Sequence, residues 1–265
     1  IVVWSETAFV PAIEYHTRHR PDPEIYELVR ELRAYLDDQP VPFVIGNSDG
    51  QLVQNEEGEF ERVDYNSVLL HDEGGFSEPY RKIHLVPFTE HFPYERQLPW
   101  LYDLLVENNT AFWGEGEDFT IFEAAGVRFA TPICFEDTFG YISRRFVNEG
   151  AEIIVNLTND SWSKSVPAAM QHMAMAVFRA VENRRSMVRS TNGGMTTIID
   201  PNGTIVDMYP AFVEGYLIGD VPIYTGTDTV YTAAGNWAAI VFLVAALSLL
   251  TFGAVRAVVV RIRAR

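Results

Sequence analysis

The segment GVRFATPICFEDTFG, residues 126–140, decides the fold because it joins an apolar strand to a helix. Residues 127–131 have the apolar character of a buried strand, and residues 138–148 have helical spacing. The lone cysteine, Cys134, stands between the two. A thiol at such a turn is exposed on one side and lies near helix N-terminal N–H groups, which favour the thiolate. The segment predicts an α/β protein with a reactive cysteine, although a lone cysteine is more often a small core residue.

Two further segments place charged residues at the ends of strands. VVWSETAFVP, residues 2–11, carries Glu6, and YRKIHLVPFTEHFPY, residues 80–94, carries Lys82 and Glu90. A thiol nucleophile needs a base, and without a Cys–His–Asn pattern a carboxylate is the most economical candidate. A lysine beside both groups would stabilise negative charge on a tetrahedral intermediate. Taken singly, each of these charged residues is more often a solvated surface residue.

The rest of the body alternates helices and strands. Residues 23–36 have helical spacing, with Asp22 as the N-cap. Hairpins are expected at residues 56–58 and 124–126, and residues 215–222 predict a last strand. Hairpins among alternating elements favour a pair of mixed sheets covered by helices over a simple doubly wound sheet.

Composition narrows the function. The chain has 265 residues, with 20 Lys and Arg against 36 Asp and Glu, for a net charge of −16. This argues against a nucleic-acid binder, because neutralising phosphates needs clustered Lys and Arg. One cysteine excludes an internal disulfide framework and a four-cysteine zinc site. The histidines show no HExxH or paired-ligand spacing, and no glycine-rich nucleotide loop follows a strand, so no metal and no cofactor are expected.

The C-terminal segment predicts a membrane span. Residues 237–255, WAAIVFLVAALSLLTFGAV, are uncharged and mostly apolar. At about 1.5 Å per residue they nearly cover a hydrocarbon core of about 30 Å. A buried core helix is the alternative, but Ser248 and Thr251 alone make no polar stripe. Trp237 marks one interface, and the other end carries four arginines and no acidic residue: Arg256, Arg261, Arg263 and Arg265.

The positive-inside rule places these arginines in the cytoplasm and the body outside it. The predicted domains are residues 1–235, with 16 basic and 36 acidic residues and a net charge of −20, and residues 236–265, the span with its basic tail. Ile1 opens directly on a strand, with no initiator methionine and no leader. We therefore expect a C-terminal fragment, with the N-terminal edge of the catalytic domain truncated.

Glu6 in WSETA, Lys82 in YRKIHLVPF and Cys134 in PICFED resemble, in this order, the three signature segments of the carbon–nitrogen hydrolase (nitrilase) superfamily. Five segments narrow the resemblance to the apolipoprotein N-acyltransferase branch: KIHLVPFTEHFP, CFED, NLTNDSW (156–162), QHMAMAVFRAVENRR (171–185) and RSTNGGMTTIIDPNG (189–203). A single C-terminal span also fits this branch, and the resemblance covers essentially the whole chain.

The resemblance implies a nitrilase-like α-β-β-α sandwich and a two-step acyl transfer. Cys134 would take an acyl chain from a phospholipid as a thioester, and the N-terminal amine of a diacylglyceryl-cysteine lipoprotein would then accept it. Glu6 would act as the general base. Lys82 and the backbone N–H of Phe135 would form the oxyanion hole, while Glu90 would hold Lys82 or share its proton traffic.

Two stretches depart from the family's pattern. Phe135 and Glu136 follow the nucleophile where the family usually has a tyrosine and a glutamate, so position 135 loses a hydroxyl but keeps an aromatic ring. Ser163 and Lys164 stand where a Phe-Gly pair usually follows NDSW. This second departure leaves the shape of the acyl pocket open.

Apolar loops must deliver the lipid, because the acidic body has no basic surface to recruit anionic headgroups. Phe92, Trp100 and Trp162 are the substrate-binding candidates, with ordinary aromatic packing as their alternative. The implied partners are the phospholipid donor and the lipoprotein acceptor, and a monomer is expected. The implied location is the bacterial inner membrane, with the catalytic domain on the extracytoplasmic face and the C-terminus in the cytoplasm.

Two other functions remain open. A membrane-anchored carbon–nitrogen hydrolase would use Glu6, Lys82 and Cys134 on a small amide, and a binding protein would keep the fold without activity. The C-terminal span and the long agreement over residues 171–185 favour the acyltransferase over the hydrolase. The intact set of three reactive residues disfavours the binding protein.

Overall fold

The computed structural model describes residues 1–54, 58–108 and 110–264, and its strands form two mixed sheets. The first sheet has the order β1-β2-β3-β4, with β5 also paired to β3. β1 runs parallel to β2, and the other pairs are antiparallel. Its strands are β1 (Val2–Val3), β2 (Phe43–Gln54), β3 (Phe60–Asp72), β4 (Gly75–Phe76) and β5 (Tyr80–Arg81).

The second sheet has the order β11-β10-β9-β8-β7-β6. Its three central strands, β7, β8 and β9, are parallel, and its outer pairs are antiparallel. The carboxyl ends of the parallel strands therefore point to one edge, and the segment with Cys134 follows β7 there. The strands are β6 (Ile121–Ala124), β7 (Val127–Ala130), β8 (Ile153–Asn159), β9 (Ser186–Asn192), β10 (Thr196–Ile199) and β11 (Ile205–Tyr209).

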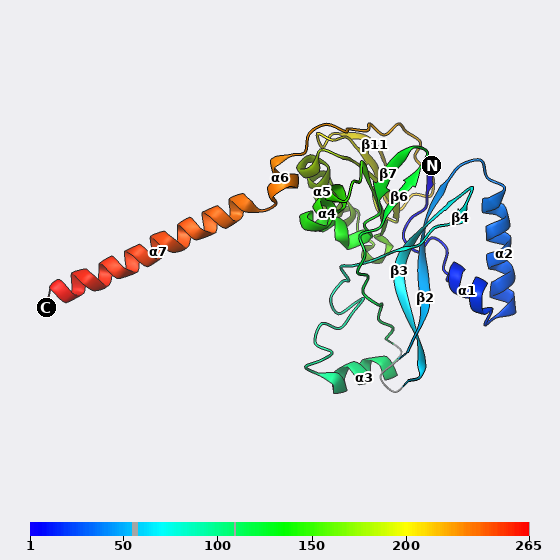
Figure 1. Cartoon of the computed structure of the whole chain (residues 1–265), viewed down its shortest axis with the longest axis horizontal. Coiled ribbons are helices and arrows are strands. Elements are labelled where there is room, and N and C mark those ends of the chain that lie inside the picture. The colour runs from blue at the N-terminus through cyan, green and yellow to red at the C-terminus, as the bar shows by residue number, and fades with distance from the viewer. Residues whose placement is uncertain (55–57, 109, 265) are drawn as a thin grey trace.

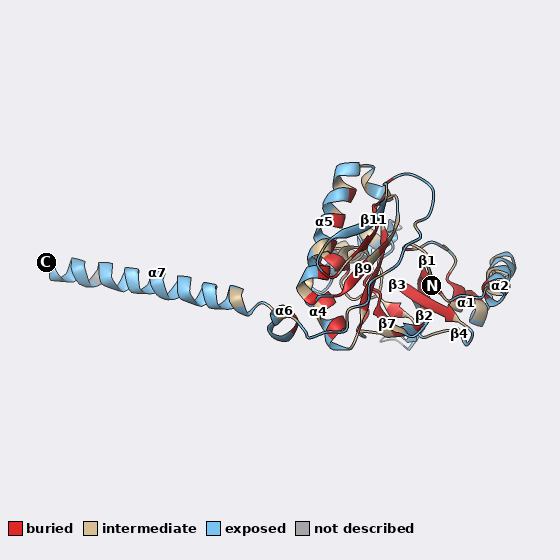
Figure 2. Ribbon diagram, turned by 90° about the horizontal axis from the view of Figure 1, so that it is seen from above, coloured by how far each residue is buried: buried red, intermediate tan, exposed pale blue. Residues whose placement is uncertain are grey.

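Alternation along the strands produces the layers, because successive side chains of a strand point to opposite faces. Val44 and Val68 belong to the core between the sheets, whereas Ile45 and Leu69 pack on the other side, under helices. The outer face of the first sheet carries α1 (Ile13–His19) and α2 (Pro23–Asp37); that of the second carries α4 (Gly140–Asn148) and α5 (Val166–Asn183) (Figure 1). This order confirms the predicted α-β-β-α sandwich, with its buried residues gathered between the layers (Figure 2).

Most predicted elements form, with some shifted ends. Asp22 caps α2, since its side chain accepts the backbone N–H groups of Glu24 and Ile25. β6 and β7 pair as the predicted hairpin around residues 124–126. β2 and β3 also pair, from Phe43 with His71 to Gln54 with Phe60, but residues 56 and 57 of the turn predicted at 56–58 lie outside the described residues.

Two expectations about local structure are wrong. The helix predicted from residue 138 begins at Gly140, because a separate 3-10 turn, Cys134–Thr138, comes first. Residues 215–222 pair with no strand in the described chain. They contain two glycines and Pro222, which weaken pairing, and Tyr216 and Ile218 are about 80% exposed. The segment is instead held by contacts such as the hydrogen bond from the Ser186 hydroxyl to the Pro222 carbonyl.

The long excursion between β5 and β6 carries α3 (Pro99–Glu107), which lies near the far end of the β2–β3 ribbon, away from α4 and α5 (Figure 1). After β11, the chain returns to α4 and α5 through α6 (Val230–Ala234). There the guanidinium of Arg144 donates to the carbonyls of Tyr231, Thr232 and Ala233. This junction fixes the start of the last helix against the body.

The last helix, α7 (Trp237–Arg263), projects away from the body (Figure 1). An 18-residue window within it has a mean hydropathy of 2.5, and none of that window is buried (Figure 2). It is therefore not a core helix of the body, and it is long and apolar enough to cross a membrane. Arg265, the last arginine of the predicted basic tail, lies outside the described residues.

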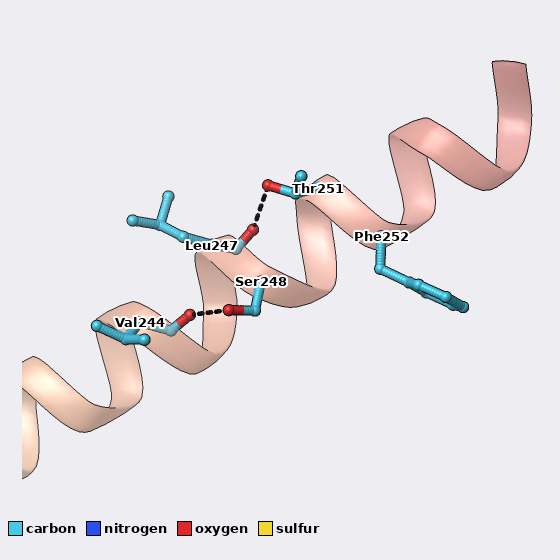
Figure 3. A pocket seen from close by; sticks show the side chains of 5 residues that line it. All are labelled: Val244, Leu247, Ser248, Thr251 and Phe252. Carbon is cyan, nitrogen blue, oxygen red and sulfur yellow. Dashed lines mark hydrogen bonds between the residues drawn. The ribbon is translucent and has the colours of Figure 1, made fainter.

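A shallow groove runs along α7 beside its two hydroxyl residues (Figure 3). The hydroxyl of Ser248 donates to the carbonyl of Val244 at 2.8 Å, and that of Thr251 donates to the carbonyl of Leu247 at 2.8 Å. Both polar groups are thus satisfied within the helix, which is what a lipid environment requires.

Candidate active site

Glu6 occupies a tight loop that the first sheet makes room for. The loop follows β1 and passes directly over Gly46 of β2, where an added Cβ would lie 2.3 Å from the carbonyl oxygen of Ser5 and 2.7 Å from Cα of Glu6. The next residue of β2, Asn47, donates to the carbonyls of Phe9 and Pro11 at 2.6 and 2.9 Å and so holds the rest of the loop. Glu6 is only 6% exposed.

Lys82 enters the same region from β5. Its backbone N–H donates to the carbonyl of Asn66 on β3 at 2.8 Å, and its side chain is fully buried. The Nζ atom lies 2.7 Å from Oε1 of Glu90 and 3.8 Å from Oε1 of Glu6. Glu90 is itself fixed, because its Oε2 accepts the backbone N–H of Val86 at 2.7 Å. Lys82 is thus a buried cation held between two carboxylates.

Cys134 comes from the second sheet. It follows Ile133, which forms a parallel bridge with Leu157 of β8, and it opens the turn Cys134–Thr138. Its φ of 49° lies in the left-handed region, which a residue other than glycine rarely adopts. The side-chain amide of Asn156 donates to the carbonyls of Pro132 and Cys134 at 3.0 and 3.2 Å. These bonds hold the backbone of a sharp strand-to-turn bend.

The structure therefore brings the three predicted residues together. The charges of Glu6 and Lys82 both act on the thiol of Cys134, and the thiol in turn acts on them. Burial raises the pKa of Glu6 above its ordinary value, although Lys82 and a hydrogen bond from Asn66 oppose the shift. Burial by itself lowers the pKa of Lys82, but the nearby Glu6, Cys134 and Glu90 outweigh it and raise that pKa. Lys82 therefore stays a cation, and Glu6 becomes a stronger base than an exposed carboxylate.

The expectation that the turn favours the thiolate is wrong for the resting site. Burial, together with the charge of Glu6, raises the pKa of Cys134 well above its ordinary value, and the opposing charge of Lys82 does not reverse this. The resting nucleophile is accordingly a neutral thiol. The carboxylate of Glu6 interacts with this thiol and is a neighbouring group able to accept a proton from it.

Glu136, the supporting residue after the nucleophile, joins the lysine segment to the cysteine segment. Its carboxylate is fully buried and accepts the hydroxyl of Tyr80 at 2.8 Å and the backbone N–H of Ile133 at 2.7 Å. It also accepts the backbone N–H groups of Ile83 and His84 at 2.8 and 3.0 Å. These bonds satisfy both carboxylate oxygens of Glu136. The side chain therefore links the lysine segment to the cysteine segment.

Phe135 packs by its ring. It meets Phe139 edge-on, with ring centroids 4.9 Å apart, and lies 6.1 Å from the ring of His84. At the second departure from the family's pattern, Lys164 adopts a left-handed φ of 48°. This is a conformation that glycine takes without strain, so the backbone at residue 164 keeps a shape suited to the glycine that the family usually has.

The three substrate-binding candidates differ in how far they are buried. Phe92 is buried, within about 6 Å of the rings of Phe88 and Tyr94. Trp100 is 64% exposed on α3, at the far end of the excursion (Figure 1). Trp162 is 77% exposed, in the short turn after β8. Phe92 therefore packs as an ordinary interior aromatic residue. The two exposed tryptophans can contact an apolar partner.

Sequence reasoning missed Asn66. Its side-chain amide donates to Oε1 of Glu6 at 2.7 Å and lies 3.5 Å from Oε1 of Glu90, so it holds the carboxylate of Glu6 in place. The available signal was the polar pair Asn66 and Ser67 inside an apolar strand, where a buried polar group needs a partner. Among the residues that the structure describes, no group of three or more His, Cys, Asp or Glu side chains is arranged to hold a metal ion.

Comparison with known proteins places this site in a family. The family model described as carbon-nitrogen hydrolase matches residues 1–230. The chain belongs to the carbon–nitrogen hydrolase family.

Two relatives carry the same name, apolipoprotein N-acyltransferase 1. The chain is 46% identical over 261 residues to apolipoprotein N-acyltransferase 1 of Treponema pallidum (strain Nichols), covering 97% of this chain and 48% of the relative. It is 47% identical over 251 residues to apolipoprotein N-acyltransferase 1 of Treponema denticola, covering 89% of this chain and 46% of the relative. The chain thus spans about half the length of the curated relatives it matches.

Solved structures support the fold. An amidase from Nesterenkonia sp. AN1, with acrylamide added at its active-site cysteine, is similar with a TM-score of 0.51 and 17% identity. The match covers 79% of this chain and 75% of the amidase. At this identity the likeness concerns the sandwich and not the substrate.

Proposed function

We propose that this protein transfers an acyl chain from a phospholipid to the N-terminal amine of a diacylglyceryl-cysteine lipoprotein, through a thioester on Cys134. The observation that carries the proposal is the convergence of Cys134, Glu6 and Lys82 from two sheets. Two further observations support it: the relatives are named as apolipoprotein N-acyltransferases, and an apolar helix is joined to the body. A phospholipid substrate needs an enzyme held at a membrane, and a soluble amide does not.

In the first step, the sulfur of Cys134 attacks the ester carbonyl of the phospholipid while Glu6 accepts the thiol proton. Lys82 and the backbone N–H of Phe135 stabilise the oxyanion. The intermediate then collapses, the ester C–O bond breaks, and Glu6 returns the proton to the leaving oxygen. The products are lysophospholipid and a thioester on Cys134.

In the second step, the amine of the lipoprotein attacks the thioester carbonyl and loses a proton to Glu6. The C–S bond breaks, Glu6 returns the proton to sulfur, and the amide product leaves. An α-amine has a pKa near 8, so part of it is neutral at physiological pH. It competes with water because the lysine is fully buried and Glu6 is nearly so, which limits water at the reacting carbon.

The proposed location follows from α7. We place α7 across the bacterial inner membrane, with its arginine-rich end in the cytoplasm and residues 1–235 as the catalytic domain on the extracytoplasmic face. Trp100 and Trp162 are proposed to meet lipid, since both expose large rings. We propose that the protein acts as a monomer.

The test is the acyl adduct. The purified protein is incubated with phospholipid in mixed micelles, and its intact mass is followed together with the site of any adduct. The expected result is an acyl group on Cys134 that hydroxylamine removes, and that is absent from the Cys134→Ser variant. No adduct with phospholipid, together with turnover of a small soluble amide, overturns the acyltransferase in favour of the hydrolase.

A further inference from the structure

Four charged side chains from four separate segments meet beside the nucleophile turn. Asp137 belongs to the turn Cys134–Thr138, Asp160 follows β8, His172 lies on α5, and Arg189 lies on β9. Nε2 of His172 lies 2.9 Å from Oδ1 of Asp137, and Nδ1 lies 2.8 Å from Oδ1 of Asp160. Arg189 lies 3.4 Å from Oδ2 of Asp137 and 3.7 Å from Oδ2 of Asp160. We call these four residues the charge cluster.

The charge cluster explains three segments of the sequence that the proposed reaction leaves without a role. NDSW supplies Asp160, QHMA supplies His172, and RSTNGG supplies Arg189 together with a glycine pair. A Cβ added to Gly194 would lie 2.5 Å from Oδ2 of Asp160, and one added to Gly193 would lie 2.7 Å from Cα of Ser161. The two glycines therefore let the loop after β9 close over Asp160.

Burial makes the charge balance of the cluster matter. Asp137 and Arg189 are fully buried, Asp160 is 3% exposed, and the side chain of His172 is 14% exposed. Burial lowers the pKa of His172, but its hydrogen bonds to Asp137 and Asp160 outweigh this and raise the pKa to about 9, against the opposing charge of Arg189. His172 is therefore protonated at neutral pH. Two cations then face two carboxylates, which is the arrangement in which buried charges are tolerated.

The charge of Asp137 reaches the nucleophile. Asp137 lies three residues after Cys134 in the same turn, and its negative charge raises the pKa of the thiol further, in addition to burial and Glu6. A carboxylate in that place, without its cations, would oppose the negative charge that the sulfur carries as it loses its proton. The groups that face Asp137 in the cluster are His172 from α5 and Arg189 from β9.

We propose that His172 and Arg189 are positioning residues for the Cys134 nucleophile, because together they fix Asp137 in the nucleophile turn and cancel the negative charge of Asp137 and Asp160. This inference rests on the proposed function, because it assumes that Cys134 is the nucleophile. It depends on no acyl substrate, so it is tested without one.

The test is the rate at which iodoacetamide alkylates Cys134, measured by intact mass across a pH series. Cys134 is the only cysteine of the chain, so the added mass reports on it alone. His172→Gln leaves the cluster one positive charge short and is expected to slow alkylation on the order of tenfold at a given pH, the size of a charge effect over several ångströms in protein. Asp160→Asn leaves one positive charge in excess and is expected to speed alkylation.

The double variant His172→Gln with Asp160→Asn restores the charge balance and is expected to return the alkylation rate toward that of the wild type. A role limited to packing predicts something else: the two single substitutions would not act in opposite directions, and the double variant would be the most disturbed. His71→Gln is the control outside the cluster, because it breaks a hydrogen bond of 2.8 Å between a buried histidine on β3 and the exposed Asp37 on α2, in the other sheet.

The proposal is overturned if His172→Gln and Asp160→Asn both keep the wild-type pH series, or if they shift it in the same direction. Where His172→Gln does not fold by circular dichroism, Asp160→Asn carries the test, and an unchanged or slower alkylation then overturns the proposal. The phospholipid experiment is independent of this outcome. Absence of an acyl adduct with the expected alkylation pattern removes the acyltransferase and leaves the charge cluster intact.

Discussion

The two sheets supply the candidate site with different kinds of electrostatic environment. The first sheet places Lys82 between Glu6 and Glu90, so that two carboxylates share one buried cation. The second sheet surrounds the turn of Cys134 with the charge cluster, in which two cations face two carboxylates. The first set therefore carries one negative charge in excess, and the second set is balanced.

This difference in charge balance suits the first set to proton transfer and the second set to holding the turn of Cys134 in place. An excess carboxylate beside a buried cation is a group that can take up a proton without leaving an unpaired charge behind. A balanced set gains nothing from a proton transfer, because any change leaves a buried charge uncompensated. We therefore expect substitutions in the first set to act on the chemical step, and substitutions in the second to act on how well Cys134 is held and on its ionisation.

Among the substitutions considered, Glu6→Gln in the first set is expected to lower the rate of adduct formation most. The amide keeps the shape of the side chain but cannot accept the thiol proton, so formation of the Cys134 adduct should slow by about 10²- to 10⁴-fold. Rapid-quench mass spectrometry of the first turnover measures it. Because burial raises the pKa of Glu6, the wild-type rate should rise as the pH rises through that raised value, and this rise should vanish in the variant.

Glu31→Gln provides the control for this change, since Glu31 is an exposed carboxylate on α2. It should leave both the rate and the pH profile as they are. A first turnover at the wild-type rate in Glu6→Gln would remove the carboxylate from the proton transfer, and with it the distinction between the two sets.

Gly46→Ala tests whether the first set depends on the placement of its loop. The new Cβ would lie 2.3 Å from the carbonyl oxygen of Ser5, so the loop must move and Glu6 with it. A displacement near 1 Å costs up to about 10²-fold in rate, and the fall should appear in kcat more than in KM. Gly253→Ala on α7 is the control, because an added Cβ there meets no atom within 4 Å. Equal activity of the two variants would contradict the loop argument.

The sequence predicted the first set better than the second. Glu6 and Lys82 of the first set, like Cys134 itself, could be found because each lies at the end of a strand and because their order resembles a known family. Asn66 had a weaker signal, since a polar residue in a strand shows that a partner is needed but not which residue it is, here Glu6 at 2.7 Å. The thiolate expectation failed for a related reason: burial of Cys134 depends on packing between sheets, which no local pattern records.

For the fold as well, local features were predicted from the sequence and long-range features were not. Hairpins among alternating helices and strands predicted the pair of mixed sheets, and Asp22 predicted the start of α2 correctly. Residues 215–222 looked like a strand because their apolar residues recur, but a strand needs a partner edge, and pairing is a long-range property. The charge cluster is long-range as well, since its members span residues 137–189 and meet only through the parallel strands.

A pH titration of stability isolates the second set. Since its folded pKa of about 9 lies above the ordinary 6.5, His172 adds stability that is complete below about pH 6.5 and is lost as the pH rises through about 9. The upper limit of this loss is about 3 kcal/mol in the free energy of unfolding. Thermal unfolding at several pH values should show the decline in the wild type, and His172→Gln should flatten it. An equally steep decline in the variant would show that the titration of His172 does not cause the loss of stability.

Phe135→Tyr is expected to have the smallest effect and refines how the second set supports the nucleophile. The ring packs edge-on against Phe139 and near His84, so replacing Phe135 by Tyr keeps those contacts and restores the hydroxyl that the family usually carries. First-turnover acylation should change by less than about threefold. Phe135→Ala loses the ring contacts, worth about 0.5–1.5 kcal/mol per aromatic pair, and should slow acylation about tenfold. A larger rise in acylation rate with Phe135→Tyr than the fall with Phe135→Ala would contradict this. Hydrogen bonding at position 135, and not ring packing, would then set the acylation rate.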